Sequence, residues 1–337
     1  MIMRYITKLL SLLILVLVVS ACSQPQLVSL AGRTMGTTYH IKLVPNKHLP
    51  DEQLLQAEID MALERVNNQM STYRPASELS QFNLSKAGQR TRVSQDTILV
   101  LQEAIKLYEQ TDGALDVTLG PLINLWGFGP EKRPIKVPSK LDIDIAKAKM
   151  GIEGVSIEPG HLVKHNSDLY VDLSSIAKGF GVDVVAAVLD KYQVSGYLVE
   201  VGGEISVKGH KLDGQPWRVA IEQPDATGRE VSKVISLKDM AMATSGDYRN
   251  YFEDKGVRFS HLIDPRTGYP INHKLASVTV LHPSSMSADG YATAMMVMGT
   301  EASLALASEL DLAIMLIEKQ PHGYQIHYSD AFLPYVQ

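Results

Sequence analysis

The stretch Ser287–Met298, SADGYATAMMVM, places an acid and a hydroxyl at the start of a run of small and apolar residues. Asp289 and Thr293 are four residues apart, so they lie on one face of a helix. The apolar tail, residues 294–298, is typical of a helix that a protein core surrounds. Two interpretations remain open. The spacing alone favours an N-terminal cap, and the alternative is a pair of ligands for a hard ion such as Mg²⁺.

A buried helix needs other elements around it, and the rest of the chain supplies both helices and strands. Helices are also expected over residues 51–68, 94–111, 144–150, 176–192 and 302–309. Strands are expected over residues 28–33, 38–44, 162–169, 198–201, 204–208, 217–221, 231–237, 276–281, 313–318 and 324–328. This order lacks the regular alternation of a doubly wound sheet. It predicts an α+β fold with mixed, mainly antiparallel sheets and packed helices.

The N-terminus has the pattern of a bacterial lipoprotein signal peptide. Arg4 and Lys8 flank the start of an apolar run at residues 9–19, which is too short to span a bilayer comfortably. The segment VSAC at residues 19–22 then matches a lipobox and contains Cys22, the only cysteine of the chain. An ordinary signal peptide with a chance cysteine is the alternative. The expected organisation is a lipoprotein signal peptide over residues 1–21, lipid attachment at Cys22, a tether over residues 22–29 and one domain over residues 30–337.

Charge and motifs exclude several classes of protein. The chain has 32 basic and 37 acidic residues and a net charge of −5, which becomes 30 − 37 = −7 without Arg4 and Lys8. Nucleic-acid binding needs a basic face, so it is not expected. There is no G-x-G-x-x-G between a strand and a helix, no G-x-S-x-G, no H-E-x-x-H and no cysteine pair for zinc. Among the ten histidines, His261 differs because a turn-rich segment, LIDPRTG, follows it and could hold its ring in place.

Eight segments of the chain, in order, resemble the ApbE family. Together they cover essentially the whole expected mature chain, and eight long segments in register are far more specific than any single motif. The segments are RTMGTTY (Arg33–Tyr39), MSTYRPASELSQFN (Met70–Asn83), GALDVTLGPLINLWGFG (Gly113–Gly129), VDLSSIAKGFGVD (Val171–Asp183), VEVGGEISVKG (Val199–Gly209), ATSGDYRNYF (Ala243–Phe252), SHLIDPRTGYPI (Ser260–Ile271) and SADGYATAMMVMG (Ser287–Gly299).

The resemblance implies an ApbE-like fold and a flavin transferase that uses FAD and Mg²⁺. Members of the family are bacterial FAD:protein FMN transferases, which cleave the FAD pyrophosphate, attach FMN to a threonine of a partner protein and release AMP. The implied partners are redox subunits of NQR- and RNF-type membrane complexes, such as NqrC and RnfG. The implied location is a lipid anchor at the periplasmic face of a bacterial membrane. Ser23 rather than an acid follows Cys22, so inner-membrane retention is not signalled and the choice of membrane stays open.

The resemblance also implies which residues bind the metal and the flavin. The metal ligands would be Asp289, Thr293 and the backbone carbonyl of Ala177. Gly202 and Gly203 would let the chain approach the ligand closely. For two of the implied flavin contacts, Met35 and Tyr73, plain packing in the protein is the alternative. These contacts are Met35, Tyr73, Ala114, Leu115, Asp116, Ser174, Phe180 and Ile263.

His261 is the candidate general base for the accepting hydroxyl. The alternative is that Asp289, or the metal alone, activates the hydroxyl and that His261 is structural. Two other functions stay open, namely an FAD pyrophosphatase that gives FMN and AMP, and a lipid-anchored protein that binds FAD without turnover. The mark of the last would be the loss of Asp289 or Thr293, and both are present.

Overall fold

The computed structural model describes residues 26–130, 136–225, 230–248 and 250–336. The expected signal peptide and the lipidation site Cys22 lie outside these ranges. The first strand begins at Val28, so the last two residues of the expected tether belong to the fold. In the described ranges, no helix combines the length and the apolar character that crossing a membrane requires.

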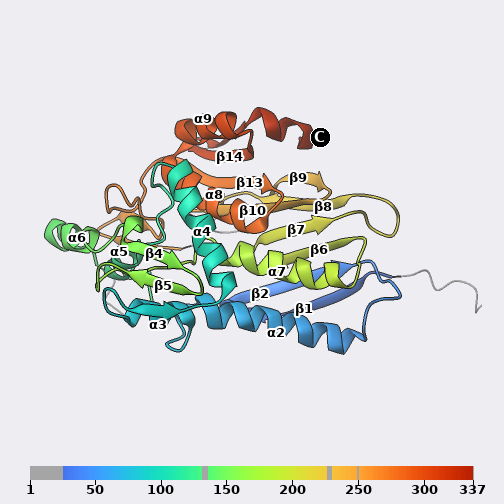
Figure 1. The fold of residues 1–337 in the computed structure, drawn as a ribbon. Coiled ribbons are helices and arrows are strands. Elements are labelled where there is room, and N and C mark those ends of the chain that lie inside the picture. The colour runs from blue at the N-terminus through green and yellow to red at the C-terminus, as the bar shows by residue number, and fades with distance from the viewer. Residues whose placement is uncertain (1–25, 131–135, 226–229, 249, 337) are drawn as a thin grey trace, which may run out of the picture.

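The framework is one sheet of eight strands in which every neighbouring pair is antiparallel (Figure 1). The helices and the antiparallel pairing confirm the expected fold class. The central strand β13 is buried along nearly its whole length, because other elements cover both faces of the sheet. In spatial order the strands are β1 (Val28–Thr34), β2 (Thr37–Leu43), β6 (Tyr197–Val201), β7 (Glu204–Lys208), β10 (Met240–Gly246), β13 (Leu275–His282), β14 (Ala313–Gln320) and β15 (Gly323–Tyr328).

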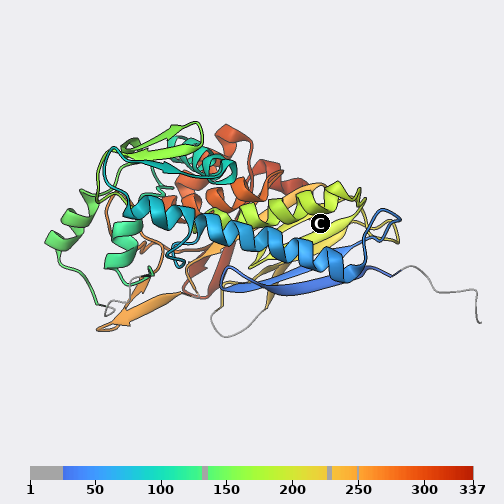
Figure 2. The ribbon, with the colours of Figure 1, turned by 60° about the horizontal axis from the view of Figure 1, so that its bottom comes forward.

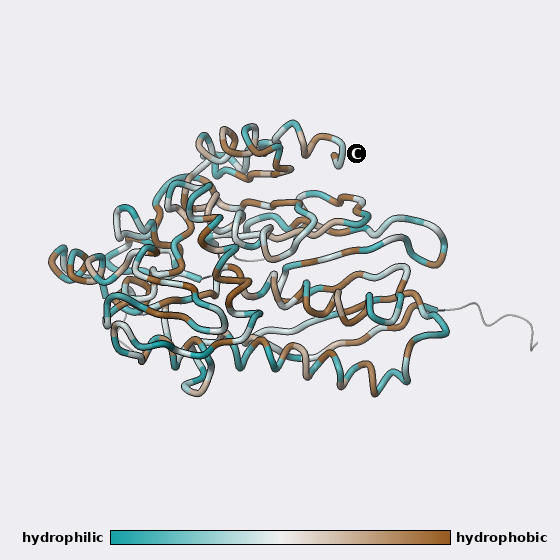
Figure 3. The backbone as a smooth tube through the Cα atoms, in the orientation of Figure 1, coloured by the Kyte–Doolittle hydropathy of each residue, from teal (hydrophilic) through white to brown (hydrophobic). Residues whose placement is uncertain are grey.

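Helices cover one face of this sheet (Figures 1 and 2). The helices α2 (Glu52–Met70) and α7 (Ala177–Lys191) pack together, α8 (Ser285–Met298) lies against α7, β10 and β13, and α4 (Gln95–Gln110) packs on α8. As its sequence predicts, α8 is buried on nearly all sides. The next helix, α9 (Thr300–Leu310), packs on β14. Figure 3 shows hydrophobic residues concentrated along the strands and inner helices.

A separate hairpin covers the other face of the sheet. It is formed by β8 (Trp217–Glu222) and β9 (Val231–Leu237), which pair antiparallel. Apolar side chains of this hairpin pack in one core with Met315 of β14 and with Phe332 from the 3-10 turn η2 (Asp330–Tyr335). The large sheet therefore lies between a helical layer and a hairpin layer.

Short elements gather at one end of the sheet, at the left of Figure 1. A fully buried lysine, Lys164, joins two of their loops by donating hydrogen bonds to the carbonyl oxygens of Asn83, Ser167 and Leu169, at 2.7, 2.9 and 3.2 Å. Burial lowers the pKa of this lysine. The elements at this end are α3 (Glu78–Leu84), β3 (Arg90–Arg92), α5 (Gly120–Leu125), α6 (Lys140–Lys147), η1 (Ile152–Gly154), β4 (Val155–Glu158) and β5 (His161–Lys164).

Two carboxylates join α7 and α8 reciprocally, an arrangement called here the helix clasp. Asp183 on α7 accepts hydrogen bonds from the backbone N–H groups of Ser285 and Met286 at the start of α8, at 2.9 and 3.0 Å. In return, Asp289 on α8 accepts one from the backbone N–H of Gly179 at the start of α7, at 2.9 Å. A glycine is required there, because a Cβ atom would lie 2.2 Å from the carbonyl oxygen of Ser285.

Several elements differ from the sequence expectation, among them α8, α6 and β10. The helix α8 begins at Ser285 with Ser284 as its N-cap, so Asp289 lies in the second turn and its interpretation as the N-terminal cap is wrong. The helix α6 begins at Lys140, earlier than expected, because a capping box starts it there. The strand Met240–Gly246 is not among the expected strands, because its small residues give no clear alternation of apolar and polar side chains.

Replacing Asp183 with alanine is expected to lower the free energy of unfolding by about 2 kcal/mol, because three donors at the start of α8 lose their acceptor. Urea unfolding followed by circular dichroism measures this loss. The matched control is Lys208→Ala, which removes a half-exposed ion pair of 2.8 Å with Asp190 of α7 and should lower stability by less than about 1 kcal/mol. Equal losses in the two variants would contradict the role of the helix clasp.

Candidate functional site

A cavity of about 740 Å³ lies at the end of α7 where the helix clasp is. The β1–β2 turn, the first turn of α7, the middle of α8 and the end of β10 form its walls, together with the loops before α5 and after the strand β12 (Val257–Ser260). It therefore collects residues from both halves of the chain. Its polar lining residues are Thr37, Asp116, Asp172, Ser174, Ser175, Lys178, Glu204, Thr244, Ser245, Tyr248, Asn250, His261, Asp289 and Thr293.

Three charged side chains meet in the cavity wall and are called here the ion cluster. The Nζ atom of Lys178 lies 2.5 Å from Oε1 of Glu204 and 3.8 Å from Oδ1 of Asp289. Glu204 and Asp289 are only 2% and 5% exposed. Oε2 of Glu204 is buried and has no hydrogen-bond partner among the described residues. Buried carboxylate oxygens normally accept a hydrogen bond, so this oxygen marks a place for a donor from a ligand.

Burial and charge act against each other in the ion cluster. Burial raises the pKa of Glu204 to about 7, while the Lys178 ammonium opposes this shift and the Asp289 carboxylate adds to it. Burial also raises the pKa of Asp289, against the opposing effects of Lys178 and the Gly179 N–H. Burial alone would lower the pKa of Lys178, but the two carboxylates outweigh it and raise that pKa. The cluster thus keeps a protonated ammonium between two acids.

Two further aspartates hold turns that face the cavity. Asp116 Oδ1 accepts hydrogen bonds from the backbone N–H and the hydroxyl of Thr118, at 2.7 and 2.6 Å. Asp172 Oδ1 accepts the same pair from Ser174, at 2.8 and 2.5 Å. Burial raises the pKa of the Asp116 carboxyl, and the Thr118 hydrogen bonds oppose this shift. Each aspartate fixes the loop after it, so the oxygens that face the cavity keep their positions.

His261 lines the cavity at the point where β12 ends. Its Nδ1 atom lies 2.9 Å from the carbonyl oxygen of Asn250. A carbonyl only accepts hydrogen bonds, so Nδ1 carries the proton in the neutral ring and Nε2 keeps its lone pair. Burial lowers the pKa of this imidazole, and the hydrogen bond to Asn250 opposes the shift. His261 is therefore neutral and able to accept a proton near pH 7.

The residues expected to hold Mg²⁺ are placed compatibly with that ion. Asp289 and Thr293 both line the cavity, and Ala177 begins α7 immediately before Lys178, which lines it too. Across the part of the chain that the structure describes, no group of three or more His, Cys, Asp or Glu side chains is arranged for a metal. The expected set of metal ligands contains one side chain of these types, that of Asp289. Mg²⁺ commonly uses few protein ligands and completes its shell with water and phosphate oxygens, so these residues fit it.

Most of the residues expected at the site come together at this cavity. Gly202 lines it, whereas Gly203 is not among the lining residues. Four other expected residues, Met35, Tyr73, Ala177 and Phe180, lie outside the lining. The expected residues that do line the cavity are Ala114, Leu115, Asp116, Ser174, His261, Ile263, Asp289 and Thr293.

The residues outside the lining occupy three different settings. Met35 lies in the β1–β2 turn beside the cavity with a left-handed φ of 49°, which is unusual for a residue with a side chain, and it packs against Gly181 of α7. Tyr73 is 65% exposed in the loop after α2. Phe180 is buried and lines a separate hollow between α2 and α7 together with Asp183. Met35 therefore borders the cavity through its neighbour Gly36, as Ala177 does through Lys178.

Sequence reasoning did not single out several residues of the cavity wall. Lys178 and Glu204 belong to segments that carry the family resemblance. In the sequence, however, a charged residue next to glycines is typical of an exposed turn. Asp172 and Thr244 are likewise cavity residues that were not expected. The available signal was position alone, because Lys178 directly follows Ala177 and Glu204 directly follows Gly203.

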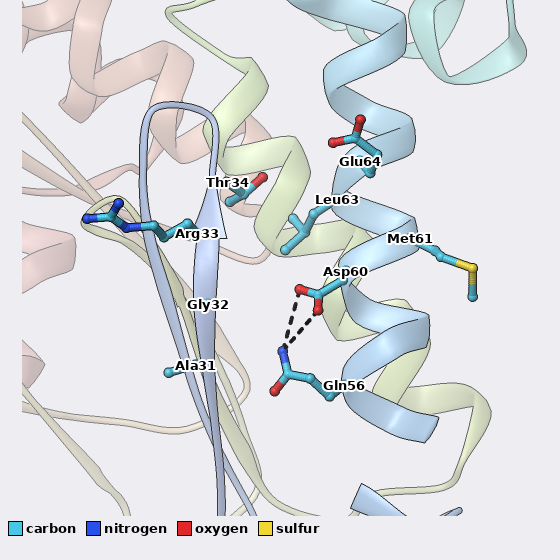
Figure 4. A pocket seen from close by; sticks show the side chains of 9 residues that line it. All are labelled: Ala31, Gly32, Arg33, Thr34, Gln56, Asp60, Met61, Leu63 and Glu64. Atoms are coloured by element: carbon cyan, nitrogen blue, oxygen red, sulfur yellow. Dashed lines mark hydrogen bonds between the residues drawn. The ribbon is translucent and has the colours of Figure 1, made fainter. Parts of the chain in front are cut away.

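A second hollow of about 690 Å³ lies between β1 and α2 (Figure 4). There Gln56 donates to both carboxylate oxygens of Asp60, at 3.5 and 3.4 Å, and the side chain of Met61 points away from the strand. No expected site residue lines this hollow, and it lacks the buried charges of the first cavity. The chemistry is therefore assigned to the cavity with the ion cluster.

Comparison with known proteins gives one consistent result. The model of the ApbE family matches residues 35–316. The FAD:protein FMN transferase of Vibrio cholerae is 50% identical over 334 residues, which is 99% of each chain. The FAD:protein FMN transferase of Haemophilus influenzae is 48% identical over 321 residues, or 93% of each chain. The solved flavin transferase ApbE from Vibrio cholerae has a TM-score of 0.86, and the match covers 92% of this chain and 99% of that one.

The imidazole of His261 is expected to titrate below its ordinary pKa of 6.5, because burial disfavours the charged ring. An NMR titration of the imidazole protons measures the midpoint, and the His261→Gln variant identifies the signal. With the folded-state pKa lowered, the unfolded chain binds this proton more readily. The resulting loss of stability therefore begins near pH 6.5 and grows as the pH falls toward the lowered pKa. A midpoint at or above 6.5 would contradict this.

Proposed function

Because this chain belongs to the ApbE family and is an enzyme that transfers flavin from FAD to a protein, we propose that the cavity holds FAD and passes its FMN part to a threonine hydroxyl of the acceptor. The observation that carries the proposal is the arrangement of the wall. A neutral histidine faces the same cavity as Asp289 and Thr293, which share one face of α8.

The proposed reaction is a phosphoryl transfer. The threonine oxygen attacks the phosphorus atom on the flavin side of the pyrophosphate, and a new P–O bond forms. The bond from that phosphorus to the bridging oxygen breaks, and AMP leaves with the bridging oxygen and its electron pair. The hydroxyl proton passes to a base. Such a reaction depends mainly on positioning and on charge neutralisation, so the protein needs few covalent partners.

The ion cluster explains why this site would need a cation. When ionised, Lys178, Glu204 and Asp289 carry one positive and two negative charges, and the pyrophosphate of FAD brings two more negative charges. Asp289, Thr293 and the carbonyl of Ala177 would hold Mg²⁺. When bound, this ion would neutralise pyrophosphate oxygens and the charge that develops on departing AMP. Lys178 keeps its ammonium at the same wall, where Glu204 fixes it at 2.5 Å.

His261 is the base in this proposal. Its Nδ1–H donates to the Asn250 carbonyl, which orients the ring and leaves Nε2 to receive the threonine proton. The lowered pKa of His261 keeps Nε2 unprotonated at neutral pH. The alternative base is Asp289, but its carboxylate already accepts from Gly179 and faces Lys178.

The flavin would lie against the apolar part of the wall. Leu115, Leu119, Ile123, Ile263 and Val297 give this wall a surface that suits a flat ring system. Ala114 and Ser174 lie beside it, and Asp116 offers a fixed polar anchor. Met35, Tyr73 and Phe180 would contribute from outside the lining.

The acceptor and the location complete the proposal. The proposed acceptors are redox subunits of the NqrC and RnfG type. A lipid on Cys22 would hold the enzyme at the periplasmic face of a bacterial membrane. The signal-peptide pattern and the family resemblance support this location, and the similarity to FAD:protein FMN transferases supports a protein as acceptor.

A single assay separates three outcomes. The purified chain without its leader is mixed with FAD, Mg²⁺ and an NqrC-type domain that bears the acceptor threonine. Flavin fluorescence on the acceptor band in a gel, with AMP released, is the expected result. AMP and free FMN without a labelled acceptor would identify an FAD pyrophosphatase. Bound and unchanged FAD would identify a carrier without turnover.

Replacing Asp289 with alanine or asparagine is expected to reduce transfer at least about 100-fold, because the only carboxylate of the proposed metal site is lost. Asparagine keeps an oxygen for the Gly179 N–H, so this variant should stay folded. EDTA should stop the wild-type reaction and added Mg²⁺ should restore it. The control is Asp213→Ala in an exposed turn far from the cavity. Full activity of either Asp289 variant would overturn the metal assignment.

A further inference from the structure

The acceptor is a protein, so part of it must enter the cavity next to His261. This inference rests on the proposed function and names the surface that would receive the acceptor. A two-stranded hairpin, formed by β11 (Tyr251–Asp254) and β12 (Val257–Ser260), leads directly to that place. Asn250 precedes the hairpin, His261 follows it, and both line the cavity. Figure 2 shows the hairpin, in light orange, projecting from the body of the molecule.

The turn of this hairpin determines which backbone N–H and C=O groups bond between its two strands and which point outward. Its turn residues, Lys255 and Gly256, have φ values of 50° and 77°, which is the pattern of a two-residue type I′ turn. Such a turn makes Asp254 and Val257 a hydrogen-bonded pair, and pairing then alternates along the strands. Farther along, the His261 N–H donates to the Asn250 carbonyl at 3.1 Å, in phase with this alternation.

The same alternation leaves the backbone groups of Tyr251 and Glu253 pointing outward from β11. Both residues are exposed, Tyr251 by 38%. On the opposite edge, Ser260 is only 4% exposed, whereas Arg258 is exposed. The Arg258 guanidinium lies over the Tyr251 ring, 3.7 Å from its centroid, and donates to the carbonyl oxygen of Asp247 at 2.6 Å. Within the part of the chain that the structure describes, neither strand pairs with a third strand. Both outward-pointing residues of β11 are therefore exposed, against one of the two on β12.

The hairpin is held firmly on one face. Phe252 stacks on Phe259 with ring centroids 5.1 Å apart, and both rings lie against Trp126, at 6.4 and 5.6 Å. The indole N–H of Trp126 donates to the carbonyl oxygen of Gly268 at 2.9 Å. An edge strand fixed in this way presents unpaired backbone groups with which an added strand can pair.

We propose that the flavin acceptor binds by adding an extended segment along the outer edge of β11. Backbone hydrogen bonds to Tyr251 and Glu253 would set the register of that segment. Glu253 is three residues from Asn250, or roughly 10 Å along a strand, so a segment that follows β11 toward Asn250 would reach the rim of the cavity that His261 also lines. The partner is thus recognised as an extended polypeptide and not as a folded surface.

A proline in place of Glu253 tests this directly. Proline removes the outward N–H of residue 253 and leaves the pairing inside the hairpin intact. With the NqrC-type domain as acceptor, we expect Glu253→Pro to lower kcat/KM for that domain about tenfold, mainly through KM. The matched control, Glu253→Ala, keeps the N–H and should stay within about twofold of wild type. FAD affinity and AMP release without acceptor should not change in either variant.

Other outcomes would overturn the proposal. If both variants match wild type, or lose transfer equally, the outward backbone of β11 is not the binding element. A loss of FAD affinity in Glu253→Pro would show that the hairpin acts on the cavity instead. If wild type were a dimer and the proline variant a monomer, the edge would pair with a second copy of this chain. A wild-type enzyme that labels no acceptor would refute the proposed function, which is a separate result.

Discussion

The helix clasp between α7 and α8 is the interaction on which the site depends. Each helix offers a carboxylate to the N-terminus of the other, where backbone N–H groups and the helix dipole stabilise negative charge. The helices can approach closely because residue 179 is a glycine. The clasp therefore fixes the relative positions of Lys178 on one helix and of Asp289 and Thr293 on the other. The large sheet beneath them adds Glu204 from the start of β7.

This arrangement buries charged groups, and burial of a charge costs free energy. Two acids that are almost fully buried would destabilise the fold if they faced only each other, and Lys178 between them offsets much of that effect. The cluster still contains more acidic than basic groups, and Oε2 of Glu204 has no hydrogen-bond partner in the described part of the chain. A site of this kind is suited to bind cations and hydrogen-bond donors, and it would accept a pyrophosphate only together with a counter-charge.

The sequence predicts the parts of this protein that local patterns specify. Helical spacing over residues 176–192 and alternation over residues 198–208 give the elements that carry the cavity, and four-residue spacing puts Asp289 and Thr293 on one face. The strand β10 escapes local reasoning, because its small residues become a strand only between β7 and β13. Local sequence patterns do not predict the ion cluster either. The contact between Lys178 and Asp289 joins residues far apart in sequence, so tertiary packing alone creates it.

The order of strands in the large sheet has a consequence for how the molecule matures. β2 pairs with β6, and the chain between them forms α2, α4, α7 and the whole group of short elements at one end. Strands β6 and β7 are joined by a turn of residues 202 and 203, whereas the β2–β6 pairing must close a very long loop, which makes it a slow step. The cavity borders that junction, with Thr37 on one side and Gly202 on the other. Flavin that binds there would stabilise the closed chain, so supply of the cofactor would help the enzyme to reach its native state.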